Sequence, residues 1–169
     1  MPLKAWAGPA LAAGSALLLS AAALAADPML ARGEYLARIM DCGGCHTPGA
    51  LRGQPDQARY LAGADVGFEL PGLGIFYPPN LTGDVETGLG AWTDQQVVAA
   101  VRTGMRPDGR MLAPIMPYHA YGALTDDDAA ALASFIKSLP AVRNKAPDPA
   151  APDGPAPAPY LSLEIPGGG

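Results

Sequence analysis

The chain has 169 residues, with 11 lysines and arginines against 16 aspartates and glutamates, which gives a formal net charge of −5. This length suits one domain with terminal extensions. The acidic balance argues against a nucleic-acid-binding protein, because phosphate recognition needs basic patches. The same balance is compatible with electrostatic steering toward a basic partner protein.

The first 25 residues have the pattern of a signal peptide. Lys4 supplies a positive charge, an uncharged apolar stretch follows, and positions 23–25 read Ala-Leu-Ala, an A-x-A cleavage site. We therefore expect residues 1–25 to direct export to the periplasm, and the mature chain to begin near Ala26. The alternative is a membrane anchor that is kept, because the uncharged stretch is long enough to span a bilayer.

The next segment, 28–40, predicts a helix. Its apolar residues recur at helical spacing. Asp27 is suited to the N-cap and Pro28 to the first helical position. This helix leads directly into the cysteine motif.

The sequence CGGCH at 42–46 contains both cysteines of the chain, Cys42 and Cys45, followed at once by His46. C-x-x-C-H is typical of covalent haem attachment. One helical turn would direct both thiols to the same side, toward the two vinyl groups of one haem, with the His46 imidazole under the iron. Two alternatives are a zinc site completed by His119 and a thioredoxin-like dithiol, although such a dithiol normally follows a strand rather than a helix.

Between positions 46 and 92 the chain has nine glycines and five prolines, and no sustained periodicity. A stretch of this length without regular structure is unusual inside a compact domain. Three modest helices bury little apolar surface, and small domains of that kind usually depend on disulfides, metals or a cofactor. We therefore expect a porphyrin to complete the core.

Two further helices are predicted, at 93–103 and 125–139. The first begins with Thr93 and Gln96 in capping-box register and ends at Gly104. The second begins with a threonine and three aspartates, which favour the helix dipole, and stops before a proline.

The loop between these helices offers the candidates for a sixth iron ligand: Met105, Met111, Met116 and His119. Prolines at 114 and 117 stiffen the backbone around Met116, so that less entropy is lost when its thioether is fixed on iron. Met116 is hence the favoured distal ligand, and Met111, His119 and an open sixth site remain alternatives. Four side chains are candidate hydrogen-bond donors to the haem propionates, although packing or solvation would explain the presence of each equally well: Asn80, Trp92, Arg106 and Arg110.

The segment 141–169 is rich in proline and alanine, and it is expected to be an extended, disordered tail. A short apolar patch near its end contains Tyr160, Leu161, Leu163 and Ile165. A frayed terminus explains this patch more simply than a docking surface does.

Five segments together resemble class I c-type cytochromes. They are CGGCH at 42–46, NLTGD at 80–84, WTDQQVVAAVRTG at 92–104, RPDGRMLAPIMPYHAY at 106–121 and LTDDDAAALASFIKSLP at 124–140. In particular, they are similar to the haem modules of cytochrome subunits in bacterial membrane-bound alcohol, aldehyde and gluconate dehydrogenases. The resemblance covers about residues 28–140.

This resemblance implies a small all-α fold, with three main helices and long loops around one haem c. It implies thioether links from Cys42 and Cys45, His46 as the proximal iron ligand and Met116 as the distal one. It also implies that the first and last helices cross, with Gly33 permitting their close approach. The dehydrogenase subunits commonly carry three such modules, whereas this chain has one C-x-x-C-H.

We therefore expect a signal peptide at 1–25, a monohaem cytochrome c domain at 26–140 and the tail at 141–169. The protein would be an electron carrier rather than an enzyme. It would pass single electrons from a periplasmic dehydrogenase to an oxidase or another cytochrome, and contact a membrane only through partners or an uncleaved signal anchor. Two alternatives are a haem enzyme or gas sensor with an open sixth site and His119 as its acid–base group, and a structural dehydrogenase subunit that works through its tail.

Overall fold

The computed structural model of the protein describes residues 27–164. The predicted signal peptide at 1–25, and with it the alternative of a retained anchor, lies outside the described residues. Within 27–164, no helix has the length and apolar character needed to cross a membrane.

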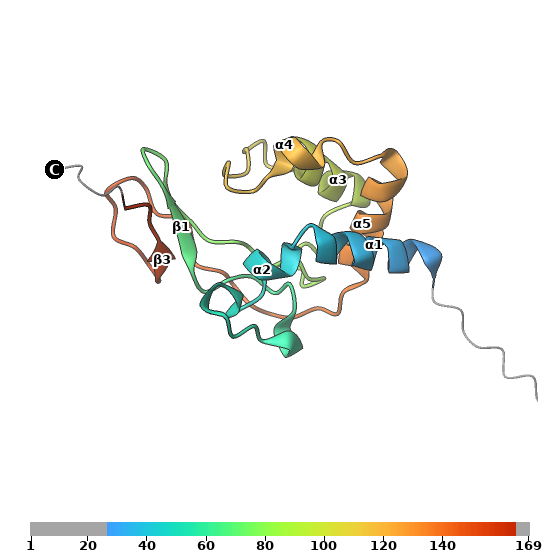
Figure 1. The fold of residues 1–169 in the computed structure, drawn as a ribbon, viewed down its shortest axis with the longest axis horizontal. Coiled ribbons are helices and arrows are strands. Elements are labelled where there is room, and N and C mark those ends of the chain that lie inside the picture. The colour runs from blue at the N-terminus through green and yellow to red at the C-terminus, as the bar shows by residue number, and fades with distance from the viewer. Residues whose placement is uncertain (1–26, 165–169) are drawn as a thin grey trace, which may run out of the picture.

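The helical part of the described chain has three longer helices and two short ones: α1 (Pro28–Ile39), α2 (Cys42–His46), α3 (Asp94–Thr103), α4 (Tyr118–Tyr121) and α5 (Asp126–Ser138). Two 3-10 turns, η1 (Ala50–Arg52) and η2 (Gln57–Arg59), follow α2. In Figure 1, α1 and α5 cross, α3 and α4 lie to one side of that pair, and α2 continues from the end of α1. The three longer helices are those expected from the sequence.

The ends of these helices also agree with the sequence pattern. The Asp27 carboxylate accepts a hydrogen bond of 2.8 Å from the backbone N–H of Met29, and a proline opens α1. Thr93 and Gln96 form the capping box at the start of α3, with reciprocal bonds of 2.9 and 3.2 Å. Gly104 ends α3 with a φ of 77°, a left-handed conformation that glycine adopts without strain.

The crossing of α1 and α5 depends on Gly33. A Cβ atom added to this residue would lie 2.6 Å from the Cβ of Phe135, and it would also strike the carbonyl oxygen of Ala131. An ion pair between Arg32 Nε and Asp128 Oδ1, 2.8 Å apart, spans the same crossing near the surface. The close approach that the resemblance implied is therefore confirmed.

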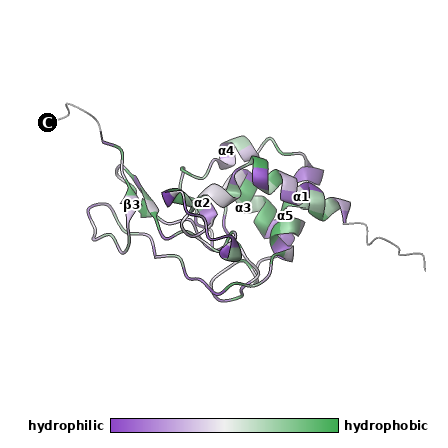
Figure 2. Cartoon of the chain, turned by 60° about the horizontal axis from the view of Figure 1, so that its bottom comes forward, coloured by the Kyte–Doolittle hydropathy of each residue, from purple (hydrophilic) through white to green (hydrophobic). Residues whose placement is uncertain are grey.

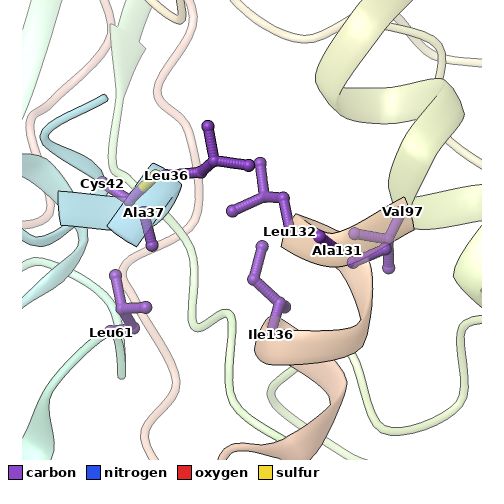
Figure 3. Close-up of a cluster of buried hydrophobic side chains, with 9 residues drawn as sticks. Leu36, Ala37, Cys42, Leu61, Val97, Ala131, Leu132 and Ile136 are labelled. Atoms are coloured by element: carbon purple, nitrogen blue, oxygen red, sulfur yellow. The ribbon is translucent and has the colours of Figure 1, made fainter. Parts of the chain in front are cut away.

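The core lies between the three longer helices and the loop that follows α2. Figure 2 shows α1, α3 and α5 gathered on one side of the molecule, each with both hydrophobic and hydrophilic residues. In Figure 3, Leu36 of α1 and Leu132 of α5 point toward each other. The buried cluster consists of Leu36, Ala37, Cys42, Leu61, Val97, Ala131, Leu132, Ala133 and Ile136. Because Cys42 belongs to this cluster, α2 is anchored to the helical core at its first residue.

A small sheet was not expected from the sequence. Its strands are β1 (Gly67–Leu70), β2 (Gly74–Phe76) and β3 (Tyr160–Leu161), in the order β2-β1-β3. Strands β1 and β2 form an antiparallel hairpin with Phe68 opposite Phe76, while β3 pairs with β1 in parallel. Strands this short show no alternating pattern, which is why the sequence does not reveal them.

The structure also differs from the expected disordered tail. Residues 141–161, which we call the C-terminal strap, run from the end of α5 past the loops to the sheet (Figure 1). Ala150 exchanges backbone hydrogen bonds of 2.9 and 3.0 Å with Ile75, and the Tyr77 hydroxyl donates to the carbonyl of Ala158 at 2.6 Å. A proline-rich chain is extended and lacks internal hydrogen bonds, so its polar groups can pair with the loops instead.

Candidate haem-binding site

The C-x-x-C-H motif forms α2, a short helix as expected. Asp41 precedes it in a left-handed backbone conformation, with a φ of 53°, and separates α2 from α1. The positions between the cysteines have little free space. A Cβ atom at Gly43 would lie 2.7 Å from the ring of Tyr60, and one at Gly44 would strike the Asp41 carboxylate. Both thiols and the imidazole are therefore held on one short, closely packed element.

The two thiols are not joined in a disulfide. Cys42 is 8% exposed, and burial raises its pKa to about 11. Burial also raises the pKa of the half-buried Cys45, with a smaller contribution from the Asp41 carboxylate. Thiol–disulfide enzymes instead lower the pKa of the attacking thiol. The site therefore gives the thioredoxin-like alternative no support.

The His46 imidazole is buried, with only 7% of the residue exposed. Its Nδ1 lies 2.8 Å from the carbonyl oxygen of Pro79. Because a carbonyl can only accept, Nδ1 carries the proton and Nε2 keeps its lone pair. Burial lowers the pKa of His46 and outweighs the opposite effect of the Pro79 hydrogen bond, so the neutral ring is favoured. A neutral imidazole with an oriented Nδ1–H is the form that binds metals.

The donor set fits haem c. Among residues 27–164, every fully buried side-chain nitrogen or oxygen has a hydrogen-bond partner. Nε2 of His46 has no such partner, so this atom is not fully buried and remains accessible. Two unlinked thiols and this nitrogen on one helical segment match the needs of a covalently attached, histidine-ligated haem. By contrast, no three His, Cys, Asp or Glu side chains in the same part of the chain converge as metal ligands, so zinc lacks a coordination shell there.

The loop that carries the candidate sixth ligands begins with a hairpin. Met105 and Met111 pair across it, and Gly109 makes its turn with a φ of 79°. Met116 follows in a second turn, closed by its N–H to the carbonyl of Ala113 at 2.9 Å. In Figure 1 this loop extends from α3 and α4 toward the side of the molecule where α2 lies.

Burial separates the four candidates for that ligand. Met105 and Met111 are 44% and 51% exposed, and His119 is exposed with its ring against Tyr118, at 4.2 Å between centroids. Met116 alone among the four is half-buried. The preference for Met116 therefore gains an argument that the sequence did not supply.

The four candidates for propionate binding divide into two groups. The Arg106 guanidinium lies over the ring of Trp92, 5.4 Å from its centroid, so these two donors are brought together. Arg110 turns instead to Asp108, at 2.7 Å. The expected propionate role of Asn80 is replaced by a structural one, because all the hydrogen-bonding groups of its amide are already paired within the fold.

Two groups beside the motif were not predicted. One is the Pro79 carbonyl, which has no side-chain signature because it belongs to the backbone. The other is the Tyr121 hydroxyl, which donates to the carbonyl of Met40 at 2.8 Å. Burial, followed by the nearby thiols of Cys42 and Cys45, raises the pKa of Tyr121 to about 12, which keeps the phenol protonated as a donor.

Residues 30–140 match the family described as Cytochrome c. The chain belongs to the cytochrome c family. Membership in this family implies a covalently bound haem c. The C-x-x-C-H sequence that this cytochrome contains is CGGCH.

Relatives of this cytochrome include subunits of dehydrogenases. It is 40% identical over 126 residues to the alcohol dehydrogenase (quinone) cytochrome c subunit of Gluconobacter oxydans, which covers 72% of this chain and 24% of that protein. It is 39% identical over 110 residues to the fructose dehydrogenase cytochrome subunit of Gluconobacter japonicus, covering 64% and 21% respectively. A diheme cytochrome c-type protein of Cereibacter sphaeroides is 31% identical over 146 residues, covering 77% and 48%. The cytochrome thus matches less than a quarter of the length of the two dehydrogenase subunits, and these relatives support a role in electron transfer.

Proposed function

We propose that this cytochrome is an exported monohaem carrier of single electrons, with its haem tethered through Cys42 and Cys45 and its iron held between His46 and Met116. The observation that carries the proposal is the 2.8 Å hydrogen bond from His46 Nδ1 to Pro79, which leaves Nε2 as the ligand atom. The haem, when bound, supplies an iron that alternates between the ferric and ferrous states.

The protein residues determine how readily that alternation occurs. The Nδ1–H bond to a carbonyl makes the His46 ring a stronger electron donor, which favours ferric iron. A thioether is a soft ligand that favours ferrous iron, and His/Met ligation raises the reduction potential. Iron ligated by both His46 and Met116 would have no free coordination position for a substrate and would need little ligand rearrangement on gaining or losing an electron.

The proposed donor is a periplasmic dehydrogenase, and the proposed acceptor is an oxidase or another cytochrome. Export is supported by the signal-peptide pattern of residues 1–25. A dehydrogenase partner is supported by relatives that are cytochrome subunits of alcohol and fructose dehydrogenases. The single C-x-x-C-H supports one haem. Encounters between redox partners usually bury a small area, so we expect weak and transient complexes.

Replacing Met116 tests the distal side. In Met116→Ala, we expect the far-red sulfur-to-iron band of the ferric protein to disappear and the reduction potential to fall, because the soft ligand is lost. Met111→Ala is the matched control, since it removes an exposed methionine from the same loop and should keep the band. Optical spectra and a redox titration of the purified holoproteins measure both effects.

Carbon monoxide separates the carrier from the alternative with an open sixth site. The ferrous wild-type protein should bind carbon monoxide poorly, whereas ferrous Met116→Ala should bind it stoichiometrically. Rapid stoichiometric binding by the wild type would favour a haem enzyme or gas sensor. Loss of the band in Met111→Ala, with Met116→Ala unaffected, would move the ligand to Met111.

A further inference from the structure

The Pro79 carbonyl that accepts the hydrogen bond from His46 belongs to a loop segment with few backbone donors. Pro78 and Pro79 follow each other, and neither has a backbone N–H with which to fix its own position. The placement of the Pro79 carbonyl therefore depends on other contacts of this segment, among them those of its neighbours along the chain, Tyr77 and Asn80.

Both neighbours bond through their side chains to the C-terminal strap. On one side of the proline pair, the Tyr77 hydroxyl donates to the carbonyl of Ala158 at 2.6 Å. On the other, Asn80 Nδ2 donates to the carbonyl of Val142 at 2.7 Å. Tyr77 is 6% exposed and Asn80 is 1% exposed, so neither bond competes freely with water. The strap thus holds the Pro78–Pro79 pair at both ends.

Asn144 of the strap connects this segment to a second segment, around Ala62, that also bonds to the motif. Its Nδ2 donates to the carbonyl of Ala62 at 2.7 Å, and its backbone N–H donates to Thr87 Oγ1 at 3.1 Å. Thr87 Oγ1 also accepts from Asn80 Nδ2 at 3.1 Å. Asn144 therefore ties the segment beside Ala62 to the segment that follows Pro79.

The segment beside Ala62 is itself in contact with the motif. The backbone N–H of Gly63 donates to the carbonyl of His46 at 2.7 Å. The same segment bonds to the proline loop, because Ala64 N–H donates to the carbonyl of Pro78 at 2.9 Å and Leu81 N–H donates to the carbonyl of Leu61 at 2.9 Å. The backbone and the ring of His46 are thus held by two adjoining segments that Asn144 bridges.

We propose that the C-terminal strap positions the Pro79 carbonyl against the axial histidine and thereby tunes the reduction potential, with Tyr77, Asn80 and Asn144 as positioning residues. The inference rests on the proposed function, in which His46 ligates the iron. A loosened strap weakens the hydrogen bond from Nδ1–H of His46 to the Pro79 carbonyl and lowers the basicity of the ring. The ferric state then loses stabilisation, and the potential rises.

The test compares Asn144→Ala with Lys145→Ala in the full-length holoprotein. Asn144→Ala removes the bond to Ala62, whereas Lys145→Ala removes only an exposed ion pair with Asp148 in the same strap. We expect Asn144→Ala to raise the reduction potential and to speed exchange of the His46 Nδ1 proton in the ferrous protein about fivefold, the effect of losing one hydrogen bond of ordinary strength. Lys145→Ala should change neither. Proton exchange is followed by nuclear magnetic resonance.

A merely stabilising role for the strap predicts a different result. The backbone amide of Leu132, in the core helix α5, reports global unfolding. Loss of the Asn144 bond also lowers the global stability, so this amide should exchange faster by a similar factor, and the reduction potential is the readout that a merely stabilising role would leave unchanged. If the His46 proton and the Leu132 amide accelerate together with no change in potential, the strap stabilises the fold only and the proposal is overturned. Tyr77→Phe, which removes one hydroxyl, carries the same test if Asn144→Ala does not fold.

The two proposals fail in distinguishable ways. If the His46 ring protons of the wild type lack the large shifts of an axial haem ligand, the proposed function fails. If those shifts are present but the potential and the Nδ1 proton exchange are the same in Asn144→Ala and Tyr77→Phe as in the wild type, the strap proposal alone fails.

Discussion

Substituting Gly33 by alanine tests the helix crossing on which the domain is built. The added Cβ would lie 2.6 Å from the Cβ of Phe135, about 1 Å inside the normal separation of two carbon atoms. It would also strike the carbonyl oxygen of Ala131, which belongs to the backbone of α5 and cannot rotate away as a side chain can. The two helices must therefore separate.

The expected size of the effect follows from two opposing contributions. Overpacking of this kind costs about 1–3 kcal/mol of the free energy of unfolding. Alanine is favoured over glycine inside a helix by about 1 kcal/mol. Because the obstacle is backbone, we place the overpacking cost in the upper part of its range and expect Gly33→Ala to lower the stability by about 1–2 kcal/mol.

Denaturant unfolding of the holoprotein, followed by circular dichroism, measures this difference. Ala31→Gly is the matched control, because Ala31 lies exposed on the same helix and its replacement changes helix propensity by up to about 1 kcal/mol without altering the crossing. Alanine should thus destabilise α1 at position 33 and glycine should destabilise it at position 31. A Gly33→Ala protein that is more stable than the wild type would refute the close-packed crossing.

Two other predictions concern charged groups outside the haem site. Lys137→Met should lower the free energy of unfolding by about 2 kcal/mol in denaturant titrations. The ammonium group of this half-buried lysine donates to three backbone carbonyls, and the shortest of these bonds is 2.6 Å, to Trp92. An unchanged stability would show that these bonds contribute nothing. The Asp108 carboxyl should titrate by nuclear magnetic resonance with a pKa of about 2 rather than 3.8, chiefly because of its hydrogen bond from Arg110. Since this pKa is lowered, the carboxylate stabilises the hairpin fully at pH values above the ordinary pKa of 3.8, and this stabilisation is lost as the pH falls through about 2. Arg110→Gln should bring the pKa of Asp108 back toward 3.8. A pKa that does not move in this variant would contradict the assigned cause.

Local chemistry made the helices and the haem motif predictable. Thr93 and Gln96 identify the start of α3, because a capping box needs only residues three positions apart. The C-x-x-C-H motif is likewise confined to five consecutive positions, so one short segment of sequence identifies both cysteines and the histidine. Gly33 was found differently, through the resemblance, because no local pattern marks a helix crossing.

The contacts that the sequence did not reveal join distant positions. His46 and Pro79 are 33 residues apart, and the acceptor is a backbone carbonyl that every residue type possesses. The sequence predicts a disordered tail at 141–169, which includes the strap, because this segment is rich in proline and alanine. The order of the strap comes from partners such as Ala62, which lies 82 positions from Asn144. Composition indicates the structure that a segment adopts in isolation, whereas the strap is ordered by its hydrogen bonds to other segments.

The crossing of α1 and α5 also has a consequence for the order of events during synthesis. Arg32 and Asp128, which pair across it, are 96 positions apart in the sequence. A polypeptide made from its N-terminus cannot complete this interface until the last helix has been added. During that interval Cys42, only 8% exposed in the finished domain, has not yet been enclosed. The Cys42 thiol is therefore more accessible before the final helix docks than it is in the folded domain, where residues of α5 share its buried cluster.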